Sequence, residues 1–96
     1  IGNFKFMSYN IKSSTPTIIS LNFSDQLNRT QDLRGIILTE KISEIPKFVI
    51  RNNIIDLEYN NYLNGNFDVK IGKDVLNIEN KKLCTYKGNY SKFKIT

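Results

Sequence analysis

Residues 18–37 read IISLNFSDQLNRTQDLRGII, and this stretch decides the fold class. Ile19, Leu21 and Phe23 alternate with serine and asparagine, which is the pattern of a strand with one buried face and one solvated face. A polar corner follows, and the chain becomes apolar again at Ile36. Strands that each expose one face to water are typical of an antiparallel sheet.

The polar corner, residues 25–34, contains only two apolar residues, Leu27 and Leu33. We expect a linking segment with a single helical turn, capped by Asn28 or Thr30. The two leucines should fold beneath the sheets and close part of the core.

Turn signals separate further short apolar segments along the chain. Asn52-Asn53 predicts a tight hairpin, because Asn tolerates the positive φ that a two-residue turn needs. The apolar pattern slips between Phe6 and Met7, which predicts a β-bulge in the first strand. The expected strands comprise residues 3–11, 19–24, 36–38, 47–51, 54–59, 67–71 and a last strand or strand pair within 83–95, broken at Gly88-Asn89.

Short strands with turns between them and no sustained helical period predict an all-β fold. We expect a two-layer antiparallel β-sandwich of about seven strands, of the immunoglobulin or fibronectin kind. A small Greek-key barrel is the alternative that the same pattern allows. Phe23, Ile36, Leu57 and Val69 are predicted to share the core, and the segment 75–78 should plug one end of it.

The 96 residues fit a single domain, and the net charge of +5 comes from 14 Lys and Arg against 9 Asp and Glu. Nucleic-acid binding is not expected, because the positive residues are mostly scattered lysines instead of clustered arginines. We favour a solvated strand face for the most basic region, with a patch for an acidic partner as the alternative. This region contains Lys81, Lys82, Lys87, Lys92 and Lys94.

The sequence contains no histidine, which removes the commonest general base and the usual partner of a serine or cysteine nucleophile. Asp56, Glu58 and Asp68 each stand in an alternating strand among apolar neighbours. They are expected to face outward as solubilising residues. We therefore predict no catalytic residue, no cofactor and no enzymatic activity.

Two other patterns have the residue types of a binding or a modification site. Asp25, Asn28 and Asp32 gather in one corner, but they lack the Asp-x-Asp-x-Asp-Gly order of a calcium loop. Asn-x-Ser/Thr triplets occur at Asn22, Asn28 and Asn89, as chance predicts in a chain rich in asparagine. We expect no metal site and give the triplets little weight.

Cys84 is the only cysteine, so an internal disulfide is impossible. The chain begins at Ile1, carries no secretory signal and has no apolar run of the length that spans a bilayer. We expect residues 1–96 to be one domain excised from a longer protein, with no direct membrane insertion.

Five short motifs lie at strand ends and turns between residues 17 and 83. They are Phe23-Ser24-Asp25 with Leu27, Gln31-Asp32-Leu33-x-Gly35-Ile36, Asn52-Asn53, Gly65-Asn66-Phe67-x-Val69 and Asn80-Lys81-Lys82-Leu83. In this arrangement the chain resembles the macroglobulin-like domains of bacterial α2-macroglobulins, which are large protease-trapping proteins. Bacterial immunoglobulin-like adhesin domains share a similar Phe-Ser strand and turn.

The resemblance implies a β-sandwich that packs against sister domains to build a cage, in a secreted or lipid-anchored protein of the cell envelope. Target proteases would be bound only by the full-length protein, and the isolated domain would be a monomer. The family's thioester needs a Cys followed two positions later by Glu-Gln. Here Thr85-Tyr86-Lys87 follows Cys84, so no thioester role is carried over to this cysteine.

Two other functions stay open at this point. A carbohydrate- or protein-binding sandwich would expose aromatic side chains at one end, and an adhesin stalk would be a spacer without a site. The tyrosines that could supply such an aromatic cluster are Tyr59, Tyr62, Tyr86 and Tyr90.

Overall fold

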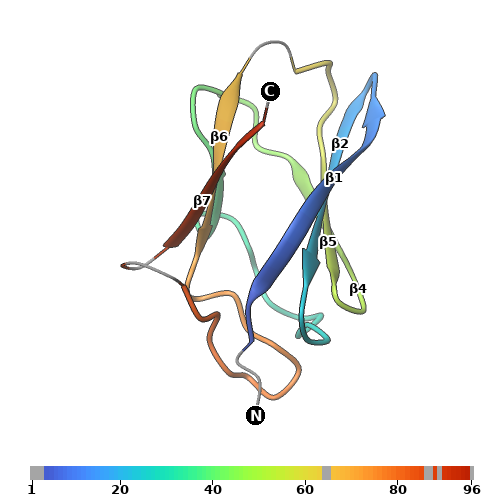
Figure 1. Cartoon of the computed structure of the whole chain (residues 1–96). Coiled ribbons are helices and arrows are strands. Elements are labelled where there is room, and N and C mark those ends of the chain that lie inside the picture. Colours follow the sequence, from blue (N-terminus) through green and yellow to red (C-terminus); the bar gives the residue numbers. More distant parts are fainter. Residues whose placement is uncertain (1–3, 64–65, 86–87, 89, 96) are drawn as a thin grey trace.

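The computed structural model describes residues 4–63, 66–85, 88 and 90–95, and in these residues the chain is a two-layer β-sandwich (Figure 1). The described residues form seven strands and no helix. This confirms the predicted fold class. The strands are β1 (Phe6–Ser14), β2 (Thr17–Phe23), β3 (Ile37–Thr39), β4 (Lys47–Arg51), β5 (Ile54–Glu58), β6 (Phe67–Gly72) and β7 (Tyr90–Ile95).

One sheet has the strand order β1-β2-β5-β4 and the other has β3-β6-β7, with antiparallel pairing throughout. No ladder joins the two sheets among the described residues, so the Greek-key barrel alternative is wrong. Strands β1 and β7 are both edge strands, and they lie on the same side of the sandwich, one in each layer (Figure 1). This placement positions the apolar surface described below.

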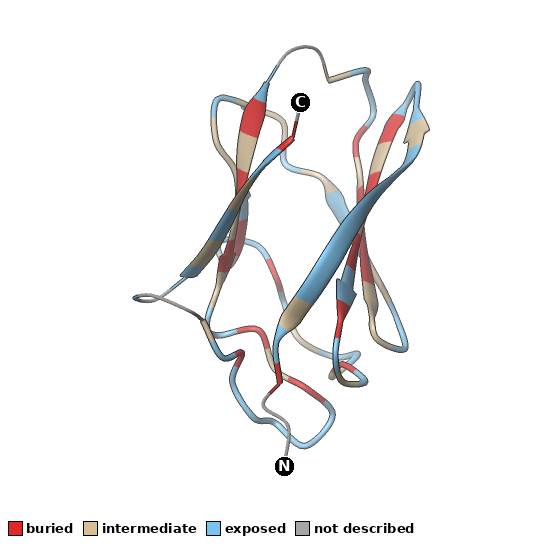
Figure 2. Ribbon diagram, in the orientation of Figure 1, coloured by how far each residue is buried: buried red, intermediate tan, exposed pale blue. Residues whose placement is uncertain are grey.

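The core lies between the sheets and is built from every second residue of the central strands (Figure 2). In β2 and β6 the odd-numbered positions are buried, as the alternation in the sequence predicts. Phe23, Leu57 and Val69 are buried as expected. The buried apolar residues are Phe4, Ile19, Leu21, Phe23, Leu27, Leu33, Ile37, Ile55, Leu57, Tyr59, Phe67, Val69, Ile71, Val75, Leu83 and Ile95.

The prediction for Ile36 was wrong by one position, because Ile37 is the buried residue and Ile36 only packs against the core from its edge. The backbone amides of both isoleucines donate to the carbonyl of Leu33, at 3.0 and 3.1 Å. Gly35 adopts φ of 83° within this turn. The turn therefore extends through Ile36, and the strand begins one residue later than the sequence pattern suggests.

The polar corner has the expected buried leucines but not the expected helical turn. Leu27 and Leu33 are both buried in the core. Asn28 accepts hydrogen bonds at Oδ1 from the backbone amide of Thr30, at 2.8 Å, and from its hydroxyl, at 2.7 Å. These bonds close a local turn, in which the asparagine side chain replaces the backbone partner that a helix would have provided.

The segment 75–78 closes the core only in part. Val75 is buried as predicted, but Ile78 is exposed, and the polar Asn77 is buried in its place. The Asn77 carboxamide accepts from the amides of Glu79 and Lys81, so the loop folds around this side chain. The final strand comprises only β7, and the Asn64-Gly65 turn and Asn89 lie outside the described residues.

The register of β1 shifts between Phe6 and Ser8, which confirms the predicted bulge, and it shifts again between Ile11 and Ser13. The hairpin between β4 and β5 is also confirmed, with Arg51 opposite Ile54. The register shifts lie in β1 and the hairpin includes β4, and these are the two edge strands of the four-stranded sheet.

Asn52 sits in this hairpin at φ of 55°, the left-handed region that β-branched residues avoid. Asn52→Ile is therefore expected to lower the free energy of unfolding by about 1–2 kcal/mol, whereas Asn52→Gly should leave it nearly unchanged. Urea unfolding of the two variants measures the difference. Equal stability of the isoleucine and glycine variants would contradict the conformational explanation.

Candidate functional site

The carboxylates of Asp56, Glu58 and Asp68 lie on the outer faces of their sheets, as expected. Asp56, however, is buried there by neighbouring side chains. Its side chain is only 1% exposed, because Lys12 and Arg51 lie over it. Glu58 is half-buried, and Asp68 forms an ion pair with Lys92 at 3.5 Å. The prediction of a solubilising residue is therefore wrong for Asp56.

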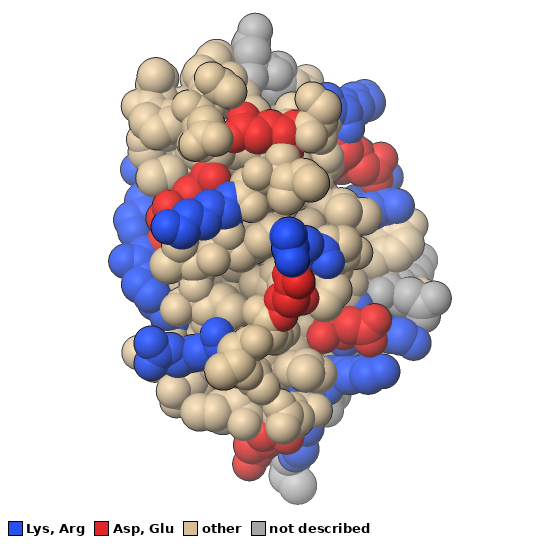
Figure 3. Space-filling view, turned by 180° about the vertical axis from the view of Figure 1, so that it is seen from behind, with Lys and Arg blue, Asp and Glu red and all other residues tan. Residues whose placement is uncertain are grey.

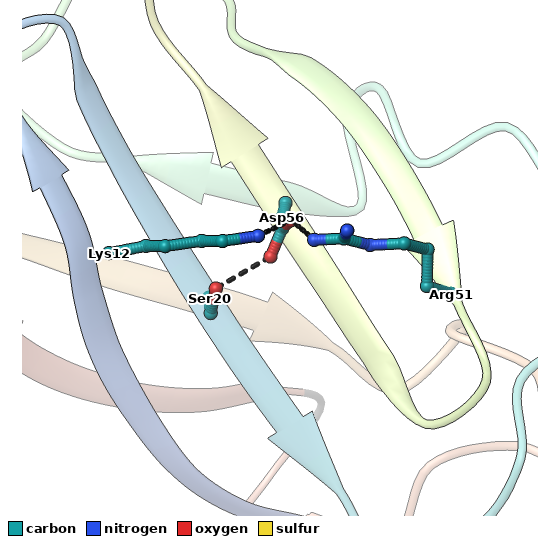
Figure 4. Close-up of polar contacts among 4 residues, drawn as sticks. All are labelled: Lys12, Ser20, Arg51 and Asp56. Atoms are coloured by element: carbon teal, nitrogen blue, oxygen red, sulfur yellow. Dashed lines mark hydrogen bonds and ion pairs between the residues drawn. The ribbon is translucent and has the colours of Figure 1, made fainter.

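Asp56 is the centre of a polar cluster that takes one residue from each strand of the four-stranded sheet (Figure 4). Ser20 on β2 donates to Asp56 Oδ1 at 2.6 Å, and Lys12 on β1 donates to Oδ2 at 3.3 Å. Arg51 on β4 also donates to Oδ2 through its guanidinium group. The cluster thus links all four strands across the sheet.

The electrostatics of this cluster favour the ionised carboxylate. Burial acts to raise the pKa of Asp56, but hydrogen bonds from Ser20 and Lys12 and the charge of Arg51 hold this pKa below its usual value. An ionised carboxylate with three donors has no proton to give and is already occupied as an acceptor. The arrangement of the cluster fits a structural role, in which the carboxylate holds the four strands together.

The residues weighed for calcium are occupied by protein partners. Asp32 pairs with Arg34 at 3.0 Å, and Asp25 accepts a hydrogen bond from the Asn77 carboxamide at 3.0 Å. Asn28 is bonded to Thr30. Within the part of the chain that the structure describes, no group of three or more His, Cys, Asp or Glu could hold a metal ion.

Of the triplet asparagines, Asn22 lies on the outer face of β2 and accepts a hydrogen bond from Asn53 at 3.0 Å. Asn28 donates to Asn80 at 2.6 Å. Asn89 lies outside the described residues. Both described asparagines thus have side-chain partners from distant parts of the sequence.

The four tyrosines weighed as an aromatic cluster do not come together where the structure describes them. Tyr59 is buried and donates to Thr39 Oγ1 at 2.8 Å, and burial raises its pKa to about 12. Tyr62 is exposed near the end of β7, whereas Tyr90 is exposed at its beginning. Tyr86 lies outside the described residues. These three side chains therefore do not form the aromatic cluster that the alternative of a binding sandwich would use.

A different aromatic group, not predicted from the sequence, joins the two sheets at their edges. The ring of Phe93 on β7 stacks on Phe6 and Tyr9 of β1, with ring centroids 5.0 and 4.8 Å apart. Ile11 and Ile95 continue this contact line toward the other end of the strands. We call the line of these five side chains the β1–β7 seam.

At the Ile11–Ile95 end, the seam opens into a pocket of about 280 Å³. Its walls come from both sheets and from the segment before β6, so residues far apart in sequence meet there. The lining residues are Ile11, Ser14, Thr17, Tyr62, Leu63, Asn66, Phe67 and Ile95. Among the described residues, the lining carries no charged side chain, which suits an apolar group of modest size.

Most of the basic residues in the last part of the chain have acidic partners. Lys81 pairs with Glu79, Lys82 pairs with Asp74 at 3.3 Å, and Lys92 pairs with Glu40 at 3.4 Å. Lys87 lies outside the described residues. On the face opposite the seam, acidic and basic side chains are interspersed (Figure 3). These contacts support the solvated-face interpretation for the paired lysines.

Comparison of the chain with protein-family models, with curated proteins and with solved structures finds no match. The described residues include no helix with the length and apolar character that a membrane crossing requires. Cys84 is exposed and unpaired as a thiol, and its backbone amide donates to the carbonyl of Phe4 at 2.7 Å. Because the comparisons find no match, the geometry of the β1–β7 seam is the main guide to function.

Proposed function

We propose that this chain is a non-catalytic β-sandwich domain that works by packing against neighbouring domains of the same polypeptide. The observation that carries the proposal is the β1–β7 seam, where the edges of both sheets and an apolar pocket lie on one side of the sandwich. Such a side offers both hydrogen-bonding edges and apolar area to a partner.

Exposed apolar side chains on or beside the seam support this function. Large exposed apolar groups that gather on one side of a small domain indicate an interaction surface. Contacts between domains in one chain typically bury about 600–1,500 Å² and include polar groups. The exposed side chains at the seam and its pocket are Tyr9, Ile11 and Tyr62.

The parent protein that we propose is a bacterial protease trap of the α2-macroglobulin type, located in the cell envelope. The support is the set of sequence motifs, whose residues occupy structural positions in this fold: Phe23 ends β2, Leu27 and Leu33 anchor the corner, and Asn52 forms the hairpin. In this function the domain is part of a frame, and proteases are captured only by the complete protein.

An adhesin stalk domain is the alternative, because it would share the fold and the contact with neighbours. The sequence on either side of residues 1–96 discriminates between the two. A distant Cys-x-Glu-Gln motif supports the protease trap, whereas a cell-wall sorting signal supports the adhesin.

A titration of the 96-residue chain against a panel of proteases tests whether this domain binds proteases by itself. We expect a folded monomer and no saturable binding tighter than about 1 μM, which corresponds to roughly −8 kcal/mol. The reason is that capture in the proposed parent protein requires the closed cage. Saturable binding below this concentration would mean that the domain recognises proteases directly, against the frame proposal.

Hydrogen exchange provides a direct test of the packing surface. The backbone amides of β1 and β7 should exchange more slowly in a longer stretch of the parent polypeptide than in the 96-residue chain. The amides of β4, on the other edge of the four-stranded sheet, serve as the internal control. Equal exchange of β1 and β7 in both proteins would reject the seam as the inter-domain surface.

A further inference from the structure

Strand β7 has a free and regular edge. It is the last strand of the β3-β6-β7 sheet, and among the residues that the structure describes it pairs only with β6, in a continuous register from Phe67 opposite Ile95 to Gly72 opposite Tyr90. The edge of β1 differs, because two register shifts interrupt it. Bulges in an edge strand hinder the addition of another strand, so β7 is the better template of the two.

The two faces of β7 differ in chemistry. Phe93 and Ile95 are opposite Val69 and Phe67, so they face the other sheet, and Ile95 lines the pocket of the seam. Lys92 and Lys94 have the opposite parity and face solvent. A strand added beside β7 would have the same alternation, with every second side chain directed toward the seam and the others next to the lysines.

Strand β7 has acidic neighbours in its own sheet, Glu40 and Asp68, but the charged residues of β1 and β7 themselves are all basic. Neither β1 nor β7 contains an acidic residue, and together they carry Lys12, Lys92 and Lys94. Lys12 and Lys92 have acidic partners, but Lys94 makes no ion pair with any described residue. Asp68 is opposite Lys94 in the register with β6, so an acidic side chain on an added strand would place an opposite charge on the other side of Lys94 as well.

We propose that β7 binds an extended segment of a partner protein as an additional antiparallel or parallel strand, and that this segment alternates apolar and acidic residues. One apolar side chain fills the pocket beside Ile11 and Ile95, and an acidic side chain pairs with Lys94. The backbone of the segment pairs with the free edge, as in other cases of β-strand addition. This inference rests on the proposed function, because it names the partner element that the seam receives.

A second copy of this chain does not fit the same site. If two β7 edges paired, the solvent-facing lysines of both copies would lie next to each other. Like charges directly opposite in neighbouring strands are destabilising. The charge of the edge therefore selects an acidic partner over a copy of the chain itself.

The test uses the acetylated and amidated peptide TVEIEVT and the 96-residue chain, with isothermal titration calorimetry for affinity and amide NMR shifts for location. We expect saturable binding with shifts confined to β7 and the pocket residues. TVKIKVT replaces both glutamates by lysine and should not bind. The scrambled peptide TVVIEET has the same composition without the alternation and should bind at least about fivefold more weakly, since it cannot direct apolar and acidic groups to opposite faces.

Matched charge reversals locate the site on the protein. Lys94→Glu should weaken binding of TVEIEVT by about tenfold, equivalent to about 1.4 kcal/mol. Lys47→Glu makes the same change on β4, at the far edge of the other sheet, and should alter the affinity by less than about twofold. Both lysines are exposed, so neither change disturbs the core.

Absence of binding at millimolar peptide, equal binding of the scrambled peptide, or equal effects of the two charge reversals would each overturn the proposal. Dimerisation of the chain through β7 without peptide would also overturn it, because the occupant would then be a second copy. The hydrogen-exchange comparison with the longer parent polypeptide is independent of the peptide. Protection of the seam in that comparison without peptide binding would keep the proposed function and reject strand addition.

Discussion

Phe23→Ala is expected to lower the free energy of unfolding by about 3–5 kcal/mol, the range for truncation of a buried aromatic side chain. Phe23 is 1% exposed and is the last residue of β2. Its ring contacts those of Phe4 and Phe6, with centroids 5.9 and 5.6 Å apart. Alanine would leave a cavity between these rings. The cavity could close only if β1 moved.

Urea unfolding followed by circular dichroism measures this effect. Met7→Ala is the matched control, because Met7 lies on β1 next to Phe6 but is 55% exposed. Its truncation should change the free energy of unfolding by no more than about 0.5 kcal/mol. A loss below about 1 kcal/mol for Phe23→Ala would show that the side chain is not part of the core.

The strand pattern that identifies Phe23 also shows which parts of the fold are readable from sequence. In β2 and β6, alternation is regular and one face is fully buried, so parity assigns the core positions correctly. The assignment by parity fails at Ile36, because the turn that precedes β3 contains one more residue than the pattern suggests. A three-residue strand is too short for its own alternation to correct the error.

For the segment 75–78, the prediction from sequence fails in part for a different reason. Asn77 is buried because its carboxamide satisfies the amides of Glu79 and Lys81 and donates to Asp25. A polar residue whose hydrogen-bonding groups all find partners can replace an apolar plug, and Ile78 is then free to face solvent. Hydropathy alone does not indicate that Asn77 is buried and Ile78 is exposed.

The β1–β7 seam depends on contacts between strands at opposite ends of the chain. Phe93 stacks on Phe6 and Tyr9 only because the strand order places β1 and β7 at the same side of the two sheets. The sequence does provide one signal, since β1 carries more aromatic and apolar residues than an exposed edge strand needs. Their partner could be identified only from the topology.

The same limit applies to the polar cluster around Asp56. Its residues come from four strands, and in sequence Lys12 is 44 positions from the carboxylate that it binds. Alternation correctly placed Asp56 on the outer face of the sheet, but burial on that face results from the long side chains of Lys12 and Arg51 lying across the strands.

Asp56→Asn is therefore expected to lower the free energy of unfolding by about 1–3 kcal/mol near neutral pH. The amide keeps an acceptor for Ser20, but it loses the negative charge and places an N–H donor opposite Lys12 or Arg51. Asp32→Asn is the control, because Asp32 also pairs with an arginine but is largely exposed. That change should lower the free energy of unfolding far less than Asp56→Asn, because solvent screens the exposed pair.

The pH dependence of this difference follows from the lowered pKa of Asp56 in the folded chain. A carboxyl whose pKa is lower in the folded than in the unfolded state contributes stability above its unfolded value, about 3.9, and loses it as the pH falls toward the folded value. The wild-type chain should thus exceed Asp56→Asn by a constant free energy from about pH 5 to pH 7, and the gap should shrink below about pH 4. Urea unfolding at each pH gives the gap, and a gap that stays constant or widens on acidification would mean that the ionised carboxylate does not stabilise the sheet.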